Sequence, residues 1–211
     1  MGKPSAIRAT AYAALAAGAL ILTLAGAPEA LGHDRCSARG AKTVLSTAKA
    51  RVFSVPIRNG RNYYGCIKGS RPIRLTTAFT SPDPQVGSVT VTTLRLSGSF
   101  VAWLQTEESD FGVGEFSQTI YVRPLRRGGR KLTVSLSERD TLAALALRGD
   151  GAVAWIRSIS DDDAEVDKVD STARKPTVLS SAPGIDPSFL SVDEDSVDWR
   201  EGGSPKSAPL R

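Results

Sequence analysis

The 211-residue sequence contains a single histidine, His33, which lies close to its N-terminus. Serine and cysteine nucleophiles usually depend on a histidine base, and histidine is the commonest protein ligand for transition metals. The sequence therefore excludes Ser-His-Asp and Cys-His catalysis, and metal sites built from histidine, from the part of the chain that follows His33.

Cysteine is almost as scarce, because Cys36 and Cys66 are the only two. Two thiols and one histidine cannot supply the four ligands of a structural zinc site. An even number of cysteines in a secreted chain favours a disulfide over reduced thiols. We therefore predict a Cys36–Cys66 disulfide that ties the N-terminal segment to the first strands.

A strong excess of one charge is also missing from the whole chain. The 27 Lys and Arg residues exceed the 22 Asp and Glu residues by only five, and removal of residues 1–32 leaves a net charge of +4. This modest basicity is not typical of a nucleic-acid-binding protein. We expect no nucleic-acid partner.

An uncharged, alanine-rich run near the N-terminus is the longest apolar stretch. Lys3 and Arg8 precede the run Ala9–Ala27, and small residues follow it up to Gly32. This order is typical of a secretory signal peptide, so we predict a signal over residues 1–32 and no membrane span in the mature chain. The predicted location is secreted, periplasmic or in the cell envelope. An uncleaved N-terminal anchor that leaves the protein extracellular is the alternative.

One short phrase recurs along the chain and predicts the fold. Phe53, Trp103, Trp155 and Trp199 are 50, 52 and 44 residues apart, and each follows an alternating strand, a tight turn and a second strand. Repeats of this length with four strands each are typical of propeller blades. We predict an all-β fold of about three and a half four-stranded antiparallel meander repeats, with these four aromatic side chains as buried structural anchors.

The predicted domain organisation follows from the spacing of these repeats. Residues 33–42 are an N-terminal lead, and residues 43–211 are the repeat domain, with approximate units at 43–80, 90–137, 142–181 and 188–211.

Two arrangements of these units are consistent with the sequence, an open stack and a small four-bladed ring, and a generic β-sandwich is a third possibility. One face of the last unit is polar at Ser196, Asp198 and Arg200, which favours an open end. In a ring, a strand around Ala41–Ser46 would complete the last unit.

Two stretches resemble repeats of a known family. "QTIYVRPLRRGGRKLTV" (Gln118–Val134) resembles the third strand, turn and fourth strand of bacterial TolB-like and WD40-like β-propeller repeats, and "RGDGAVAWI" (Arg148–Ile156) resembles their aspartate-glycine turn. The resemblance covers residues 43–211. It implies propeller-like repeats and a role in binding or scaffolding.

A basic turn is the candidate contact surface. It contains Arg123, Arg126, Arg127, Arg130 and Lys131. An anionic partner, such as a cell-envelope polymer, would bind such a turn, although charged turns also prevent edge-to-edge pairing of sheets. In the RGD tripeptide at Arg148–Asp150, Gly149 and Asp150 are explained by turn chemistry rather than by adhesion.

Two acidic hairpins are the remaining candidates for chemistry. Asp161, Asp162 and Asp163 provide hard oxygen ligands for calcium, although acidic hairpins are usually only solvated, and no other cofactor is expected. A hydrolase that uses only carboxylates would need Asp110, Glu115, Asp161 and Asp163 to face one another across a cleft.

These observations predict a non-enzymatic binding or scaffold module, secreted or in the cell envelope, that binds a protein or an anionic cell-envelope polymer. The first alternative is an extracellular carboxylate-dependent hydrolase with its site between blades. The second is a structural fragment that assembles with a partner chain, and self-association through exposed end units is also expected from an open stack.

Overall fold

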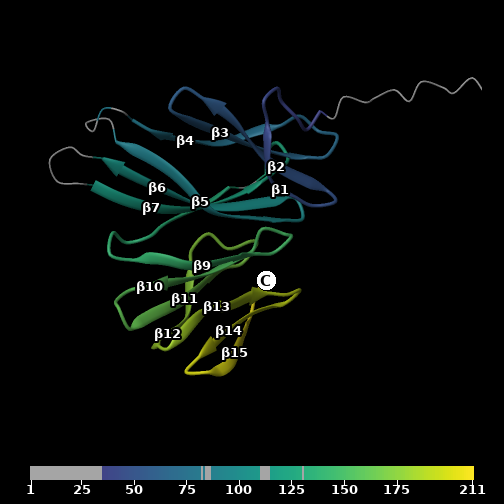
Figure 1. Ribbon diagram of the computed structural model, residues 1–211. Helices are drawn as coiled ribbons and strands as arrows, with labels where there is room; N and C mark the ends of the chain where they lie inside the picture. The colour runs from purple at the N-terminus through teal and green to yellow at the C-terminus, as the bar shows by residue number, and fades with distance from the viewer. Residues whose placement is uncertain (1–34, 82, 84–86, 110–114, 130) are drawn as a thin grey trace, which may run out of the picture. The chain divides into compact units, whose positions relative to one another are not determined.

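Figure 1 shows the computed structural model of the chain. The residues that it describes are 35–81, 83, 87–109, 115–129 and 131–211. They form fifteen β-strands and no helix, so this part of the chain has no helix that is long and apolar enough to cross a membrane. The prediction of an all-β fold is confirmed. The predicted signal peptide and His33 lie outside the described residues.

The fifteen strands follow one another along the chain with short connections. They are β1 (Lys42–Ser46), β2 (Ala50–Ile57), β3 (Gly60–Ile67), β4 (Ile73–Thr80), β5 (Ser88–Ser97), β6 (Phe100–Ser109), β7 (Glu115–Pro124), β8 (Leu132–Ser135), β9 (Thr141–Leu147), β10 (Val153–Ser158), β11 (Asp163–Val169), β12 (Thr177–Pro183), β13 (Ile185–Val192), β14 (Ser196–Glu201) and β15 (Ser204–Pro209).

All strand pairs are antiparallel, and the strands form three sheets in chain order: β1 to β8, β9 to β12, and β13 to β15. In the eight-stranded sheet, β4 and β5 share only two residue pairs, whereas β6 and β7 share ten. The sheet therefore consists of two meanders joined along a short edge. We refer to β1–β4, β5–β8, β9–β12 and β13–β15 as the first, second, third and fourth units.

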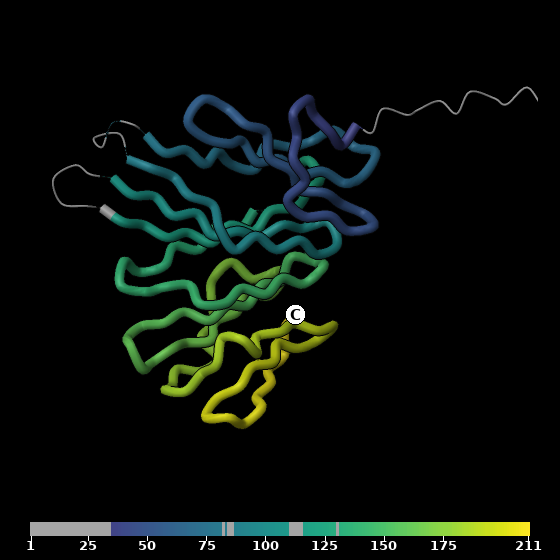
Figure 2. The backbone as a smooth tube through the Cα atoms, in the orientation of Figure 1, coloured from purple at the N-terminus to yellow at the C-terminus, as the bar shows by residue number. Residues whose placement is uncertain are grey.

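The hydrophobic core is divided into layers between successive units, which follow one another in Figure 2. Trp103 packs with residues of the first unit, including Val52. Trp155 packs with residues of the second unit, and Trp199 packs with residues of the third, including Ile156. Each tryptophan thus contacts the unit that precedes it, because alternate residues of a strand point to opposite faces.

The three tryptophans share a second property. All three indole Nε1 groups are buried without a hydrogen-bond partner in the described part of the chain. Buried polar groups are usually paired, so this repeated exception indicates that packing holds these rings in place.

Phe53 occupies the same position in the first unit, which no other unit precedes among the described residues. It is fully buried and packs with Cys36 and Cys66, so the N-terminal segment 35–41 covers the face that another unit would otherwise cover. All four predicted anchors are buried in the structure.

The structure does not support closure of the units into a ring by the N-terminal strand. The strand expected around Ala41–Ser46 is β1, which pairs with β2 through contacts such as Thr43 with Phe53, and not with β15. Only three residues connect β1 to β2, so closing this loop costs less conformational entropy than pairing β1 with the distant β15. Among the described residues, the sheets form no closed ring.

Candidate functional site

The predicted disulfide is present between Cys36 and Cys66, whose Cα atoms are 5.7 Å apart. Beside it, the ring of Phe53 stacks on Tyr64 with centroids 5.5 Å apart. The guanidinium of Arg51 lies over the Phe53 ring and donates hydrogen bonds to the Cys36 carbonyl oxygen and the Thr43 hydroxyl. These contacts fasten the N-terminal segment to the outer face of the first unit.

The predicted basic contact turn lies between β7 and β8, and the structure divides its residues. Arg123 is half-buried, and its Nη1 donates a 2.6 Å hydrogen bond to the carbonyl oxygen of Arg74 in the first unit. Arg126, Arg127 and Lys131 are exposed, and none forms an ion pair with a described residue. Arg130 lies outside the described residues.

The backbone of this turn requires glycine. Gly128 has a φ of 75°, which favours glycine. A Cβ atom on Gly129 would lie 2.2 Å from Cγ of Pro124, so the chain passes too close to this proline for any side chain. The glycines therefore fix the turn that presents Arg126 and Arg127 to solvent.

A larger accumulation of positive charge lies in the first unit and in the segment just before it. The net charge of the whole chain does not reveal it. Residues 35–80 contain ten Lys and Arg and no Asp or Glu. We call this segment the basic region. Its cations are Arg35, Arg39, Lys42, Lys49, Arg51, Arg58, Arg61, Lys68, Arg71 and Arg74. Nine of these residues are exposed and Arg51 is half-buried, and none forms an ion pair with a described residue.

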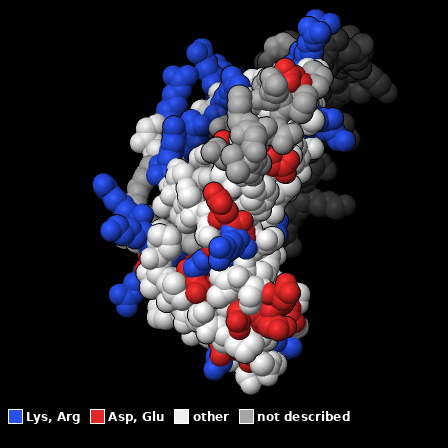
Figure 3. Space-filling view, turned by 90° about the vertical axis from the view of Figure 1, so that its left-hand side faces the viewer, with Lys and Arg blue, Asp and Glu red and all other residues white. Residues whose placement is uncertain are grey.

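The opposite charge predominates at the other end of the chain. Residues 138–211, which we call the acidic region, contain fifteen Asp and Glu but only nine Lys and Arg. On the face seen in Figure 3, Lys and Arg cover much of the upper part and a dense group of Asp and Glu lies low. The net charge of +5 for the whole chain therefore hides two segments of opposite sign, which a count of charge per predicted repeat would have shown.

A buried network of charged side chains lies on the third unit. Arg157 on β10 donates through Nε to Oδ2 of Asp167 at 2.9 Å, and it also forms ion pairs with Asp140 and Glu165. Asp140 and Asp167 are buried. Burial raises the pKa of Asp167, and the hydrogen bond from Arg157 opposes this shift. One guanidinium thus binds all three carboxylates and compensates their burial.

The alternative of a carboxylate-dependent hydrolase relied on other residues than those of this network. Asp110 and the side chain of Glu115 lie outside the described residues. Asp161 and Asp163 are exposed, and Asp163 accepts hydrogen bonds within its own turn from Ser160. The structure does not bring Asp161 and Asp163 together across a cleft.

The calcium prediction also lacks support from the described residues. No group of three His, Cys, Asp or Glu residues among them could hold a metal ion, and Asp161, Asp162 and Asp163 are not brought together into such a group. These three residues form an exposed turn, which agrees with the alternative that the hairpin is only solvated.

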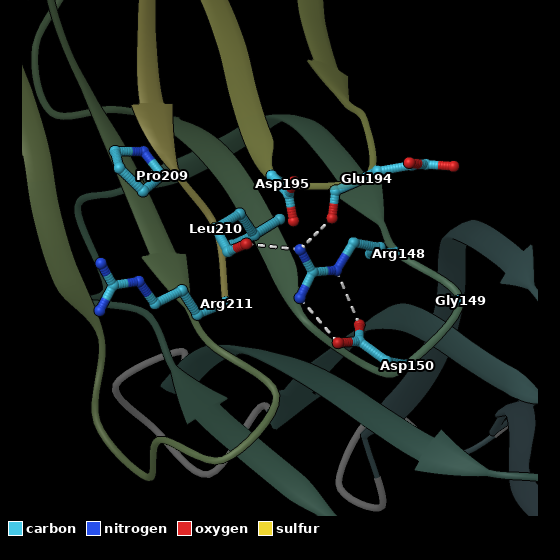
Figure 4. Close-up of a pocket in the computed structure, with 8 residues that line it drawn as sticks. All are labelled: Arg148, Gly149, Asp150, Glu194, Asp195, Pro209, Leu210 and Arg211. Atoms are coloured by element: carbon cyan, nitrogen blue, oxygen red, sulfur yellow. Dashed lines mark hydrogen bonds and ion pairs between the residues drawn. The ribbon is translucent and has the colours of Figure 1, made fainter.

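A depression of about 760 Å³ lies where the third and fourth units meet, and Figure 4 shows the eight residues that line it. Arg148 is its central cation. Its Nε and Nη2 donate to the carboxylate of Asp150 at 2.9 and 2.7 Å, and its Nη1 donates to the carbonyl oxygens of Glu194 and Leu210. The guanidinium is therefore already occupied by the protein.

Asp150 is fixed in the same way. The hydrogen bond from Arg148 lowers the pKa of Asp150 to about 2, against the effect of burial, and the backbone N–H of Ala152 also donates to its carboxylate. Both charged residues of the RGD tripeptide thus hold a turn against the last strands, although the sequence had explained only Gly149 and Asp150 by turn chemistry, and this depression is a structural junction.

Comparison with family models and with curated proteins finds no match to this chain.

Proposed function

We propose that the protein is a non-enzymatic binding or scaffold module of the cell envelope or extracellular space. The observation that carries this proposal is that some cations of the chain are paired with its own carboxylates, whereas a group of exposed cations is not. Arg148 and Arg157 are held by carboxylates of the same chain, whereas Arg126, Arg127 and Lys131 project from a glycine-fixed turn without an ion pair among the described residues. The free cations are available to a partner that carries negative charge.

The disulfide and the predicted signal peptide support the proposed compartment. Disulfides persist in oxidising compartments and are rare in the cytosol, so the Cys36–Cys66 bridge supports a secreted or periplasmic location. The signal peptide at residues 1–32 remains a prediction from the sequence.

Kinship with TolB-like and WD40-like propeller repeats is the second part of this proposal. Two observations support it: antiparallel meanders follow one another along the chain, and a buried tryptophan in each of the last three units contacts the preceding unit. Repeats of this kind mostly serve as binding surfaces. The fourth unit leaves Phe189 exposed, with Arg200 3.9 Å over its ring, and this end is where self-association or a partner chain would act.

The test uses the full chain, recovered in its secreted form and immobilised as bait. Secreted and envelope fractions of the source organism are passed over wild type and over a variant with Arg126→Ser, Arg127→Ser and Lys131→Ser. A matched control carries Arg139→Ser, Arg174→Ser and Lys175→Ser, which removes the same charge from exposed residues of the third unit and of the connection that precedes it.

We expect wild type and control to retain a partner that the turn variant loses, and the purified partner to bind with the same ranking. Retention of nothing by wild type, or turnover of polysaccharide or peptide substrates by the purified protein, would contradict the proposal.

A further inference from the structure

We propose that the basic region, residues 35–80, binds a linear anionic polysaccharide. This inference rests on the proposed function and narrows the partner to one chemical class. It also adds a contact on the first unit to the one proposed for the turn between β7 and β8.

The basic region has a one-sided charge balance. Ten Lys and Arg without any Asp or Glu in 46 residues leave no internal counter-charge, and nine of the ten are exposed. Neighbouring cations that lack partners raise the positive potential over the whole unit and attract counter-ions. The site therefore fits a polymer that carries many negative charges rather than one small anion.

These cations lie at both ends of the sheet of the first unit. Lys49 and Lys68 lie together at one end of the sheet, where the backbone N–H of Lys68 donates to the carbonyl oxygen of Lys49. Arg58 lies in the turn at the opposite end, between β2 and β3. The eight residues of β2 separate the two ends by about 26 Å at 3.3 Å per residue.

One further exposed arginine lies between these ends on the outer face. Arg74 pairs across the sheet with Tyr64, so it shares the face of the stacked Phe53 ring. Exposed cations thus occur at both ends of the sheet and between them, as an extended polymer requires.

Most cations of the basic region are arginines and not lysines. Seven of the ten cations are arginines, and the planar guanidinium binds carboxylate and similar oxyanions through two parallel hydrogen bonds. Acidic polysaccharides present such groups at regular intervals.

The same surface lacks features that nucleic acids and membranes require. Phe53 and Tyr64 stack on each other beneath the N-terminal segment, and no aromatic residue of the described first unit is among the exposed large hydrophobic residues, so bases have no stacking platform. The exposed large hydrophobic residues described in this unit are Val44 and Ile57, which lie on different strands and provide no large apolar patch for lipid.

The acidic region limits where the polymer can lie. Residues 138–211 carry six more negative than positive charges, so they repel a polyanion over distances up to the Debye length of about 8 Å at physiological ionic strength. This repulsion directs the polymer to the first unit and away from the third and fourth.

The test measures binding of heparin and polygalacturonate to the secreted full chain by fluorescence anisotropy, with neutral dextran as the negative probe. The first-unit variant carries Arg58→Ser, Lys68→Ser and Arg71→Ser, which are exposed turn residues whose side chains make no hydrogen bond or ion pair with a described residue. The control is the Arg139→Ser, Arg174→Ser, Lys175→Ser variant.

We expect wild type to bind both anionic polymers and not dextran, with affinity falling steeply as salt is raised. The first-unit variant should bind at least about tenfold more weakly, because each lost cation near an anionic surface weakens binding several-fold. The control should change by less than about twofold. A conservative variant with Arg58→Lys and Arg71→Lys should retain most of the affinity, which separates loss of charge from misfolding.

Three outcomes would overturn the inference. Binding that the Arg126→Ser, Arg127→Ser, Lys131→Ser variant loses and the first-unit variant keeps would move the contact to the turn and leave the proposed function standing. Failure of wild type to bind either polymer would remove the polysaccharide, while the bait experiment with envelope fractions still decides the proposed function. Stronger binding of duplex DNA than of heparin at equal charge would make the partner a nucleic acid.

Discussion

Replacement of Trp155 by alanine tests whether the aromatic anchors hold successive units together. Trp155 is the largest fully buried side chain in the described part of the chain, and it lies between the second and third units. Its indole N–H has no hydrogen-bond partner there, so the substitution removes packing and no described hydrogen bond. Truncation of a buried tryptophan costs about 3–5 kcal/mol in free energy of unfolding.

This loss is large compared with the total stability of a domain, which is about 5–15 kcal/mol. With a urea m-value of about 2 kcal/mol/M, the unfolding midpoint should fall by about 1.5–2.5 M. Urea titration followed by circular dichroism measures the midpoint and the m-value in wild type and variant. Trp103→Ala and Trp199→Ala should cost similar amounts, because these rings occupy equivalent places.

Val178→Ala is the control, because Val178 is 52% exposed and its truncation should change stability by less than about 0.5 kcal/mol. A Trp155→Ala midpoint within 0.5 M of wild type would refute the assignment of this ring to a packed interface between units. A normal midpoint with a much smaller m-value would instead show that the units unfold separately, which also contradicts a shared core.

Three further predictions follow from the disulfide and the charged networks. Cys36→Ser with Cys66→Ser opens a loop of 30 residues and should lower the free energy of unfolding by about 3–4 kcal/mol, measured by urea titration against the oxidised wild type; no change would show that the bridge is not formed in solution. Arg157→Ala leaves Asp140 and Asp167 buried without their cation, so it should cost about 3–5 kcal/mol at pH 7 and less at pH 4, because burial raises the pKa of Asp167 and its carboxyl takes up a proton more readily once Arg157 is removed; an equal cost at both pH values would contradict this. The pKa of Asp150 is lowered to about 2, so its ion pair contributes stability above pH 4 that is lost as pH falls towards 2; thermal melts of Asp150→Asn should lack this part of the acid dependence, and identical slopes would refute it.

The sequence predicted those features that depend on neighbouring residues. Strand alternation is local, so it located the buried faces of Phe53, Trp103, Trp155 and Trp199 correctly. The disulfide was predicted from the number of cysteines and from the compartment that the sequence led us to expect.

Features that depend on pairing and register were missed or wrong. Asp140 precedes β9, whereas Glu165 and Asp167 lie on β11, and only the register of the third sheet brings them to Arg157. Arg123 was assigned to a contact surface because of its neighbours, yet its hydrogen bond to the first unit gives it a structural role. The ring-closing strand was inferred from a likeness of residues, which carries no information about pairing partners.

The basic region was missed for another reason. Whole-chain net charge averages a segment without acidic residues with one that is rich in them, and electrostatic attraction depends on the local balance.

Lysine acetylation mapped by mass spectrometry, with and without bound polygalacturonate, tests most directly whether the first unit is the binding surface. Lys42, Lys49 and Lys68 are exposed on that unit, and Lys175 and Lys206 are exposed on the third and fourth. The account predicts that the polymer slows acetylation of the first three lysines and leaves the other two unchanged. Equal protection of all five, or protection of Lys131 alone, would contradict it.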